Sequence, residues 1–383
     1  MSVAYLDHAA TSPIRPRARQ AVEGIWDQLL GNPTGGHTLA RKARSYLEQA
    51  REVVADFLGA SASEIVFTSS GTESDNLAIK GSLQAHEQKR VLVSAIEHRA
   101  VLNTAKKSCA RLGLNLELIP VDSNAVVDLN WLEEALDDDV ALVSVMTVNN
   151  EVGTIEPIEM ISEIVRTKAP NALLHTDAVQ AACWLDLKPI WQCVDLLSLG
   201  AHKFGGPVGV GALAIKEGVK ILPLLDGGSQ ERGIRAGTQN VAGAVGMAEA
   251  LKDLTQEFDL YIQKIKHLRD QLIDSIIRDL HNVTETVKRG LKIAGNCHVL
   301  IDGVEPDQLL WMLDEKGVCV STGSSCASGA LEPSHVLEAI GTNPRRDLCA
   351  LRMTLGWSST EQEIQYGAKS VVESVRQLLS DCT

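Results

Sequence analysis

A lysine in a glycine-rich stretch is the first residue whose type and position could do chemistry. Lys203 lies in Ser198–Gly211, which reads SLGAHKFGGPVGVG and follows an apolar run that predicts a buried strand. The glycines permit backbone conformations that other residues resist. A lysine whose amine is kept neutral by burial can form a Schiff base, whereas a solvated turn lysine is the plain alternative. This stretch alone leaves both interpretations open.

Other polar residues follow predicted strands in the same way. His98, Asn150 and Asp177 each come after an apolar run, as Lys203 does. Open α/β sheets bind ligands beyond the carboxyl ends of their strands, so we expect these residues to meet at one edge. Asp177 needs a partner there, such as the protonated ring nitrogen of a cofactor, and Gln180 could donate to the same ligand. A helix cap or a buried ion pair is the alternative for Asp177.

A third candidate is an anion site at Ser69-Ser70-Gly71-Thr72. This segment lies between a short apolar run and a predicted helix. The free amide groups and the positive dipole end of a helix N-terminus bind anions, most simply a phosphate. Gly71 and Thr72 are therefore candidate phosphate contacts, and an ordinary helix N-cap is the alternative.

Cys326 differs from the other cysteines in its surroundings. It lies in Val320–Gly329, VSTGSSCASG, where no large apolar side chain follows Val320, so we expect an exposed, mobile loop. Six other cysteines lie in apolar contexts and are expected in the core: Cys109, Cys183, Cys193, Cys297, Cys319 and Cys349. No pair of cysteines or histidines has the spacing of a structural zinc site, so we expect no metal.

Arg352 lies within the apolar run of residues 349–355. A buried guanidinium requires a carboxylate, and its planar fork suits the carboxylate of a substrate. A structural ion pair explains the arginine equally well.

Composition restricts the classes of function. The chain has 383 residues and a net charge of −13, which argues against broad binding of nucleic-acid phosphates. No apolar run approaches the roughly 18 residues of a membrane span, and the first residues do not resemble a secretory signal. Scattered cysteines without a CxxC pair favour reduced thiols and a cytoplasmic protein.

Apolar runs and helical periodicities alternate over the first two thirds of the chain, which predicts βαβ units and a mainly parallel sheet. The predicted strands are 65–67, 91–94, 115–120, 140–146, 172–176 and 194–199. The predicted helices are 17–30, 39–58, 75–86, 99–111, 129–137, 158–168 and 241–280. The remainder has shorter elements: strands 297–302, 318–321 and 349–355, and helices 306–316, 334–340 and 360–380. Such a pattern predicts a smaller α+β domain.

Three parts are expected. Residues 1–15 form an N-terminal arm that packs with the small domain, residues 16–255 the large domain, and residues 256–383 the small domain. The small domain carries the cysteine loop, at about 321–332. The boundary is placed in the first half of the helix 241–280.

Together these residues resemble the cysteine desulfurases of the NifS/IscS type, which belong to the class V aminotransferases and to fold type I of the enzymes that use pyridoxal 5'-phosphate (PLP). The resemblance covers almost the whole chain. It rests on YLDHAAT at the start, GNP near residue 32, FTSSGTESDN, EH at 97–98, NNEVG, DAVQ, HK at 202–203, GT at 237–238, the Cys326 loop and Arg352. The loop is the specific motif, since related aminotransferases share the early ones in looser form.

The resemblance implies a fold with a mainly parallel seven-stranded sheet and a role for each matching residue. Lys203 would bind PLP as a Schiff base, Asp177 would pair with the pyridinium nitrogen, and His98 would stack on the ring and relay protons. Gln180 and Asn150 would bond the ring oxygen or the substrate, and Arg352 would bind the substrate carboxylate. The phosphate would be held by Gly71, Thr72, His202 and, from the neighbouring subunit of a homodimer, Thr238. Gly200 is a departure, since the family often has serine there as a phosphate donor.

The resemblance also implies an activity. L-Cysteine would be converted to L-alanine, and Cys326 would carry the sulfur as a persulfide to an acceptor, such as an iron–sulfur scaffold or a tRNA-thiolation enzyme. A selenocysteine lyase or a related class V aminotransferase is the alternative enzyme. A sulfur carrier on a catalytically dead fold is the alternative from another class. No direct contact with nucleic acid or membrane is expected.

Overall fold

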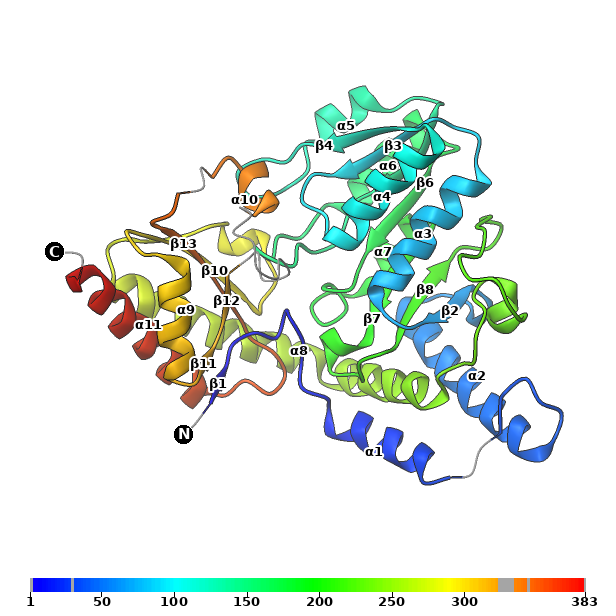
Figure 1. Cartoon of the computed structure of the whole chain (residues 1–383), viewed down its shortest axis with the longest axis horizontal. Coiled ribbons are helices and arrows are strands. Elements are labelled where there is room, and N and C mark those ends of the chain that lie inside the picture. Colours follow the sequence, from blue (N-terminus) through cyan, green and yellow to red (C-terminus); the bar gives the residue numbers. More distant parts are fainter. Residues whose placement is uncertain (1–2, 29–30, 323–333, 343–344, 382–383) are drawn as a thin grey trace.

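The computed structural model describes residues 3–28, 31–322, 334–342 and 345–381. A large sheet with helices on both faces forms one part, and a smaller sheet with helices packed around it forms the other (Figure 1). The long helix α8 (Val241–Asp279) runs between the two parts.

The large sheet has seven strands in the order β2-β8-β7-β6-β5-β3-β4. They are β2 (Ile65–Thr68), β3 (Arg90–Ser94), β4 (Asn115–Ile119), β5 (Val140–Ser144), β6 (Leu173–Asp177), β7 (Leu196–Gly200) and β8 (Gly211–Ile215). The strands β3 to β7 are parallel to one another, and β8 is antiparallel to both of its neighbours. This confirms the expected α/β fold with a mainly parallel sheet of seven strands.

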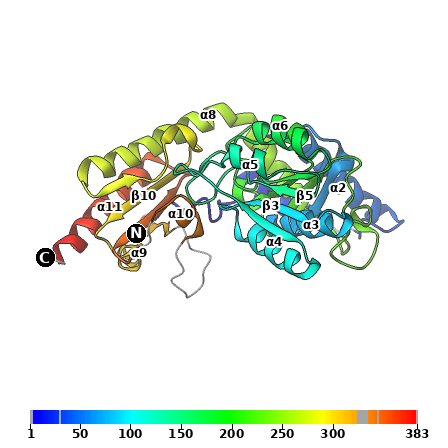
Figure 2. The ribbon, with the colours of Figure 1, turned by 90° about the horizontal axis from the view of Figure 1, so that it is seen from above.

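Side chains of the central strands alternate between two apolar layers, because successive residues of a strand point to opposite faces. In β3, Val91 and Val93 pack in a cluster with residues of α3 (Gly71–Ala85) and α4 (Arg99–Leu112). Leu92 belongs to the other cluster, which contains residues of α6 (Ile158–Lys168). The sheet therefore lies between α3 and α4 on one face and α6 on the other (Figure 2). The remaining helices of this part are α1 (Pro16–Trp26), α2 (Thr38–Leu58), α5 (Leu129–Ala135) and α7 (Leu187–Cys193).

The smaller sheet has the order β12-β13-β10-β9 and is antiparallel. Its strands are β9 (Val283–Glu285), β10 (Asn296–Asp302), β12 (Ser321–Thr322) and β13 (Leu348–Thr354). The helices around it are α9 (Pro306–Glu315), α10 (His335–Ala339) and α11 (Glu361–Asp381).

The N-terminal arm, residues 3–15, joins the two parts. Its strand β1 (Ala4–Tyr5) pairs in parallel with β11 (Val318–Cys319), and Asp7 forms an isolated bridge with Thr354 at the end of β13. Farther along the arm, Arg15 donates to the carbonyl of Phe204, close to the glycine-rich stretch after β7. The arm thus spans from the small sheet to the end of a strand of the large sheet.

Helix α8 is continuous over 39 residues and packs on α1 and α2 as well as on α11. The domain boundary that we propose near residue 255 lies within it. Among the described residues, no helix combines the length and the apolar character that a membrane crossing requires.

The structure corrects several expectations. The strand β8, the helix α7 and the strand β9 were not predicted; β8 reads GALAI, whose small residues give little apolar signal although all five are buried. The predicted strand 318–321 is split, because β11 pairs with the arm and β12 pairs with β13. Cys193 and Cys319 are only half-buried, since both lie at the ends of short elements rather than in the core.

Candidate active site

The carboxyl ends of β3, β5, β6 and β7 carry the polar residues that the sequence singled out. Asp177 is the last residue of β6, and Lys203 follows β7 in a short 3₁₀ turn. His98 precedes the first residue of α4, in the connection after β3. Parallel neighbours place these ends at one edge of the sheet, and His98 and Asp177 are close enough to each other and to Lys203 for these charges to act on the pKa of both.

Asp177 is 5% exposed and accepts a hydrogen bond at Oδ1 from the amide of Val179, at 2.9 Å. Burial raises the pKa of its carboxyl, while His98, the Val179 amide and Lys203 act in the opposite direction. The anion is therefore costly in this position unless a cation lies beside it.

His98 is fixed by the start of α4. Its Nδ1 accepts from the amide of Ala100 at 3.1 Å, so the neutral ring carries its proton on Nε2. Burial lowers the pKa of His98, which Asp177 partly opposes. The ring is thus neutral near pH 7.

A buried polar cluster lies around Asp177, and two of its members, Asp75 and His175, were not among the expected site residues. Asp75, His98 and Asp177 each place a potential ligand atom within 4.8 Å of the others. Burial, reinforced by Asp177, raises the pKa of Asp75 well above its ordinary value. His175 lies behind, with Nε2 3.7 Å from Asp75 Oδ1 and 3.1 Å from Ser198 Oγ. A cation at the three ligand atoms would compete with a ring nitrogen for Asp177.

Only one signal in the sequence pointed to this cluster. His175 lies two residues before Asp177 in an apolar strand, so both side chains face the same side of the sheet. Asp75 lies in the first turns of α3, and the contact between the two depends on how that helix packs on β6 and β7.

Lys203 is held by the N-terminal arm. Its Nζ donates to the carbonyl of Ala9 at 2.6 Å and to that of Ala10 at 2.8 Å. Gln180, 7% exposed, also donates to the Ala9 carbonyl, at 2.9 Å. The lysine is therefore no solvated turn residue: it is half-buried and directed by contacts distant in sequence.

The start of α3 has the expected N-cap, and its first turn is compatible with an anion site. Ser70 is an N-cap whose Oγ accepts from the Glu73 amide at 3.1 Å. Gly71 and Thr72 occupy the first turn, where amides have no carbonyl acceptor within the helix. A Cβ on Gly71 would lie 2.5 Å from Cγ2 of Val179, so only glycine allows this close approach.

Gly200, the last residue of β7, lies close to the Gly71 amide and the Val179 side chain. A Cβ there would lie 3.4 Å from the Gly71 nitrogen and 3.3 Å from Cγ1 of Val179. The serine that is common in the resembled family would thus be crowded by Val179, and glycine leaves the Gly71 amide accessible. His202, also assigned to the phosphate, has Nδ1 3.2 Å from Thr11 Oγ1, and burial lowers its pKa to about 4.

Arg352 reaches the site from β13. It is 3% exposed and donates through Nη2 to Asp7 Oδ1 and through Nη1 to the Asn150 carbonyl, both at 3.0 Å. The alternative of a structural ion pair is therefore realised. Its Nε is buried and has no hydrogen-bond partner among the described residues.

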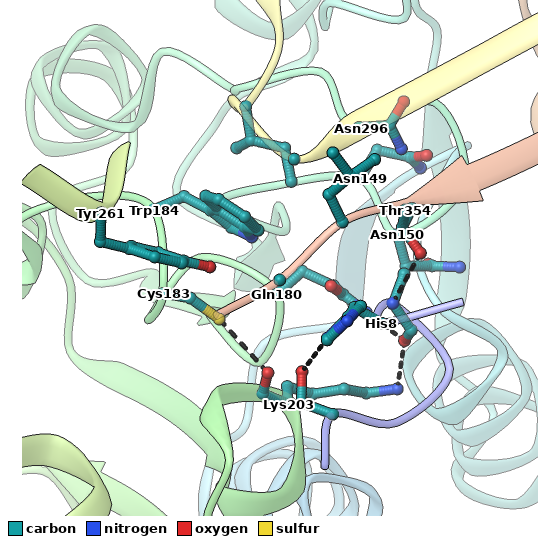
Figure 3. Close-up of a pocket in the computed structure, with 16 residues that line it drawn as sticks. His8, Asn149, Asn150, Gln180, Cys183, Trp184, Lys203, Tyr261, Asn296 and Thr354 are labelled. Carbon is teal, nitrogen blue, oxygen red and sulfur yellow. Dashed lines mark hydrogen bonds between the residues drawn. The ribbon is translucent and has the colours of Figure 1, made fainter. Parts of the chain in front are cut away.

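A pocket opens between the arm, the large sheet and the small sheet (Figure 3). Of the expected site residues, Lys203, Asn150 and Gln180 line it, while His98 and Asp177 lie outside its wall. The sequence analysis did not single out several other lining residues: His8, Cys183, Trp184, Tyr261, Asn296 and Thr354. Trp184 and Tyr261 stack with ring centroids 5.3 Å apart, a contact between two distant segments that no local pattern predicts.

The other described residues expected at the site also lie outside the lining of this pocket: Gly71, Thr72, His202, Arg352 and Thr238. Thr238 is exposed and lies in the connection before α8. Cys326 lies outside the described residues.

The residues present fit PLP. Burial raises the pKa of Asp177, so a ring cation would stabilise its anion, and the Gly71 amide at the start of α3 lies near the Gly200 position, where a phosphate would be bound. In the strand order, Lys203 follows β7, which neighbours β6 on one side, and His98 follows β3, which lies beyond β5 on the other side of β6.

Comparison with known proteins agrees with this fold and site. The sequence profile of the family "Aminotransferase class-V" matches residues 4–366. Cysteine desulfurase IscS of Dictyoglomus turgidum is 42% identical over 94% of this chain and 92% of its own length. An IscS-like cysteine desulfurase of Mycobacterium tuberculosis is 40% identical over 94% of this chain and 93% of its own length.

Solved structures are similar over the same extent. A structure described as a NifS-like protein superposes with a TM-score of 0.92, at 35% identity, over 98% of this chain and all of the other. One described as SspA in complex with cysteine has a TM-score of 0.79 and 31% identity, over 92% of this chain and 98% of the other.

The fold is that of the PLP-dependent enzymes of fold type I. Within that class, the chain belongs to the class V aminotransferase family.

Proposed function

We propose that this protein is a PLP-dependent cysteine desulfurase that converts L-cysteine to L-alanine and transfers the sulfur to Cys326 as a persulfide. The observation that carries the proposal is the convergence of Asp177, His98 and Lys203 at the carboxyl ends of β6, β3 and β7, with Arg352 nearby. The names of the relatives, cysteine desulfurases at about 40% identity over nearly the full length, supply the substrate.

PLP, when bound, withdraws electrons from the bond that the reaction breaks. Asp177 would keep the ring nitrogen protonated, because opposite charges favour each other's ionised form. His98 would lie against the ring and move a proton through Nε2. Gly71, Thr72 and His202 would hold the phosphate, with Thr238 of a second subunit.

The substrate would be held by Arg352 and Asn150. Lys203, whose Nζ is directed by the Ala9 and Ala10 carbonyls, would hold the cofactor and exchange a proton with the substrate. Cys326, as a thiolate, would attack the substrate sulfur. The carbon–sulfur bond breaks, a sulfur–sulfur bond forms, and the substrate carbon takes up a proton, which gives alanine.

The remaining expectations belong to the same proposal. The protein would be a cytoplasmic homodimer and would pass sulfur to an acceptor protein, such as an iron–sulfur scaffold or a tRNA-thiolation enzyme. Residues 16–255 would form the cofactor-binding domain and residues 256–383 the small domain.

Cys326→Ser tests the sulfur transfer. The variant should retain PLP and bind L-cysteine but form neither alanine nor sulfide, because a hydroxyl is no competent nucleophile toward sulfur. Mass spectrometry of the wild-type protein after treatment with L-cysteine should locate a persulfide on Cys326.

Cys193→Ser, at a half-buried cysteine that ends α7, serves as the control and should leave turnover unchanged. Sulfide release at the wild-type rate from Cys326→Ser would contradict the desulfurase mechanism. Activity of that variant toward selenocysteine alone would instead indicate a selenocysteine lyase.

A further inference from the structure

The guanidinium of Arg352 is held at two of its three nitrogens. Asp7 Oδ1 and the Asn150 carbonyl occupy Nη2 and Nη1, each at 3.0 Å. The side chains of Arg352 and Asp7 are 4% and 20% exposed, so the ion pair is largely shielded from water. Nε has no partner among the described residues although it is buried.

An unsatisfied donor of this kind points to a ligand. A buried nitrogen of a charged group that lacks an acceptor costs free energy in the absence of a partner. Nε and Nη2 form one edge of the guanidinium, and a carboxylate binds along such an edge with both oxygens. Asp7 Oδ1 engages only Nη2, so it leaves Nε and the second Nη2 hydrogen for another carboxylate.

Asp7 is itself anchored by the small sheet. The amide of Thr354 donates to the Leu6 carbonyl at 2.7 Å, and the amide of Ala9 donates to Thr354 Oγ1 at 2.8 Å. Thr354 lies two residues after Arg352 in β13. The backbone on either side of Asp7 is therefore attached to the strand that carries the arginine.

The same turn of the arm holds the lysine. The carbonyl of Asp7 accepts from the amides of Ala10 and Thr11, at 3.1 and 3.4 Å. The carbonyls of Ala9 and Ala10 accept from Lys203 Nζ. One turn, residues 7–11, thus contacts both Arg352 and Lys203.

We propose that Asp7 is a positioning residue that orients Arg352 toward the carboxylate of the substrate and links this contact to the placement of Lys203. The inference rests on the proposed function, because it takes an amino acid as the substrate. It assigns to residues 7–11 a role in selecting amines that carry an α-carboxylate. Loss of the Asp7 charge should therefore weaken binding of the carboxylate and leave the chemical step almost intact.

The test compares two ligands that differ only in the carboxylate. L-Alanine, the product, and ethylamine, its decarboxylated analogue, are titrated into the PLP-loaded protein while the visible absorption of the cofactor is followed. The wild-type protein should bind L-alanine more tightly than ethylamine. Asp7→Asn should raise the dissociation constant of L-alanine about tenfold and leave that of ethylamine unchanged, since one charged contact has been lost.

Kinetics provide a second readout. Asp7→Asn should raise KM for L-cysteine with less than a threefold change in kcat, as expected for an interaction that serves binding. Asp7→Glu keeps the charge and should retain the preference for L-alanine over ethylamine. Asp138→Asn, at an exposed position of the large domain, is the matched control and should change the dissociation constant of neither ligand.

Four outcomes would overturn the inference. The first is that Asp7→Asn weakens binding of both ligands equally, which is the behaviour of a structural residue, and the second is that it weakens binding of neither. An equal loss of L-alanine binding in Asp7→Glu and Asp7→Asn would exclude the charge as the cause. A wild-type protein that does not distinguish L-alanine from ethylamine would overturn the carboxylate site at Arg352, and with it this part of the proposed function.

Discussion

Asp75 and Asp177 place two carboxyl groups within 4.8 Å of each other, and both are at most 5% exposed. Two anions at this distance in a buried site cannot both be stable. Asp177 has the Val179 amide, His98 and Lys203 to favour its anion, whereas burial and Asp177 itself hold the pKa of Asp75 high. Asp75 is therefore the protonated member, and Asp177 is the one that can pair with a cation.

This difference predicts unequal effects of two similar substitutions. Asp177→Asn should lower kcat/KM about 10²–10³-fold even when PLP is bound, because a preorganised electrostatic partner is lost. Asp75→Asn replaces a neutral acid by a neutral amide of the same shape, so kcat/KM should decrease less in this variant. Turnover and cofactor content are measured on the same samples. A PLP-loaded Asp177→Asn protein with wild-type turnover would rule out the role of Asp177.

Lys203→Ala tests the covalent attachment of the cofactor. The wild-type protein, supplied with PLP, should show the visible absorption band of the lysine-bound cofactor, and the variant should not. Lys216→Ala, a lysine whose Nζ donates to the carbonyls of Gln192 and Val194 away from the pocket, is the control and should keep the band. An unchanged band in Lys203→Ala would contradict the assignment.

At the scale of elements, a buried ion pair connects α2 to the segment before α8. Arg51 donates to Glu231 through Nη1 at 2.6 Å and through Nη2 at 2.9 Å, and the two side chains are 2% and 1% exposed. Glu231 also accepts from the amide of Phe67 in β2 and from Gln239 Nε2. This carboxylate thereby fixes the connection that carries Thr238.

Removal of one partner from this pair should be strongly destabilising. Glu231→Gln should lower the free energy of unfolding by about 3–5 kcal/mol, because Arg51 would remain buried without its counter-charge. Glu48→Gln is the control, since Glu48 contacts the same arginine but is 50% exposed, and it should cost about 1 kcal/mol or less. Denaturation by urea measures both. Equal losses in the two variants would contradict the argument.

The same pair predicts a pH dependence of stability. Burial alone would raise the pKa of Glu231, but its hydrogen bonds with Arg51 and the charge of that arginine lower it below the ordinary value of 4.5. The stabilisation is therefore present above pH 4.5 and is lost as the pH falls through the lower pKa of the folded state. In Glu231→Gln, the free energy of unfolding should therefore decrease less as the pH is lowered below 4.5.

At the scale of the whole molecule, Thr238 lies outside the pocket, which is consistent with the proposal that it serves a second subunit. Large apolar side chains are exposed in neighbouring segments: Val208 at 75%, Leu222 at 45% and Leu225 at 49%. A second copy of the chain would cover such surface. Sedimentation should therefore give about twice the chain mass of 41.3 kDa. A fully active monomer would contradict the homodimer.

Local patterns in the sequence were enough to predict most helices and the parallel strands of the large sheet. The apolar runs that form β3, β5, β6 and β7 are buried on both faces, and such strands are recognisable without knowledge of their neighbours. The positions of His98, Asp177 and Lys203 at strand ends followed directly. Strand β8 was missed because glycine and alanine fill it, and its identity as a strand depends on pairing with β2 and β7.

The sequence by itself determined the alternation of elements and therefore which polar residues lie at the carboxyl ends of the strands. This is possible because βα units are short, right-handed and local, so that chain order predicts position. Only the tertiary structure decided which groups touch. Asp7 and Arg352 are 345 positions apart, and Ala9 and Lys203 are 194 apart. These contacts depend on the packing of the arm between two sheets. The position of such a segment cannot be predicted from local periodicity in the sequence.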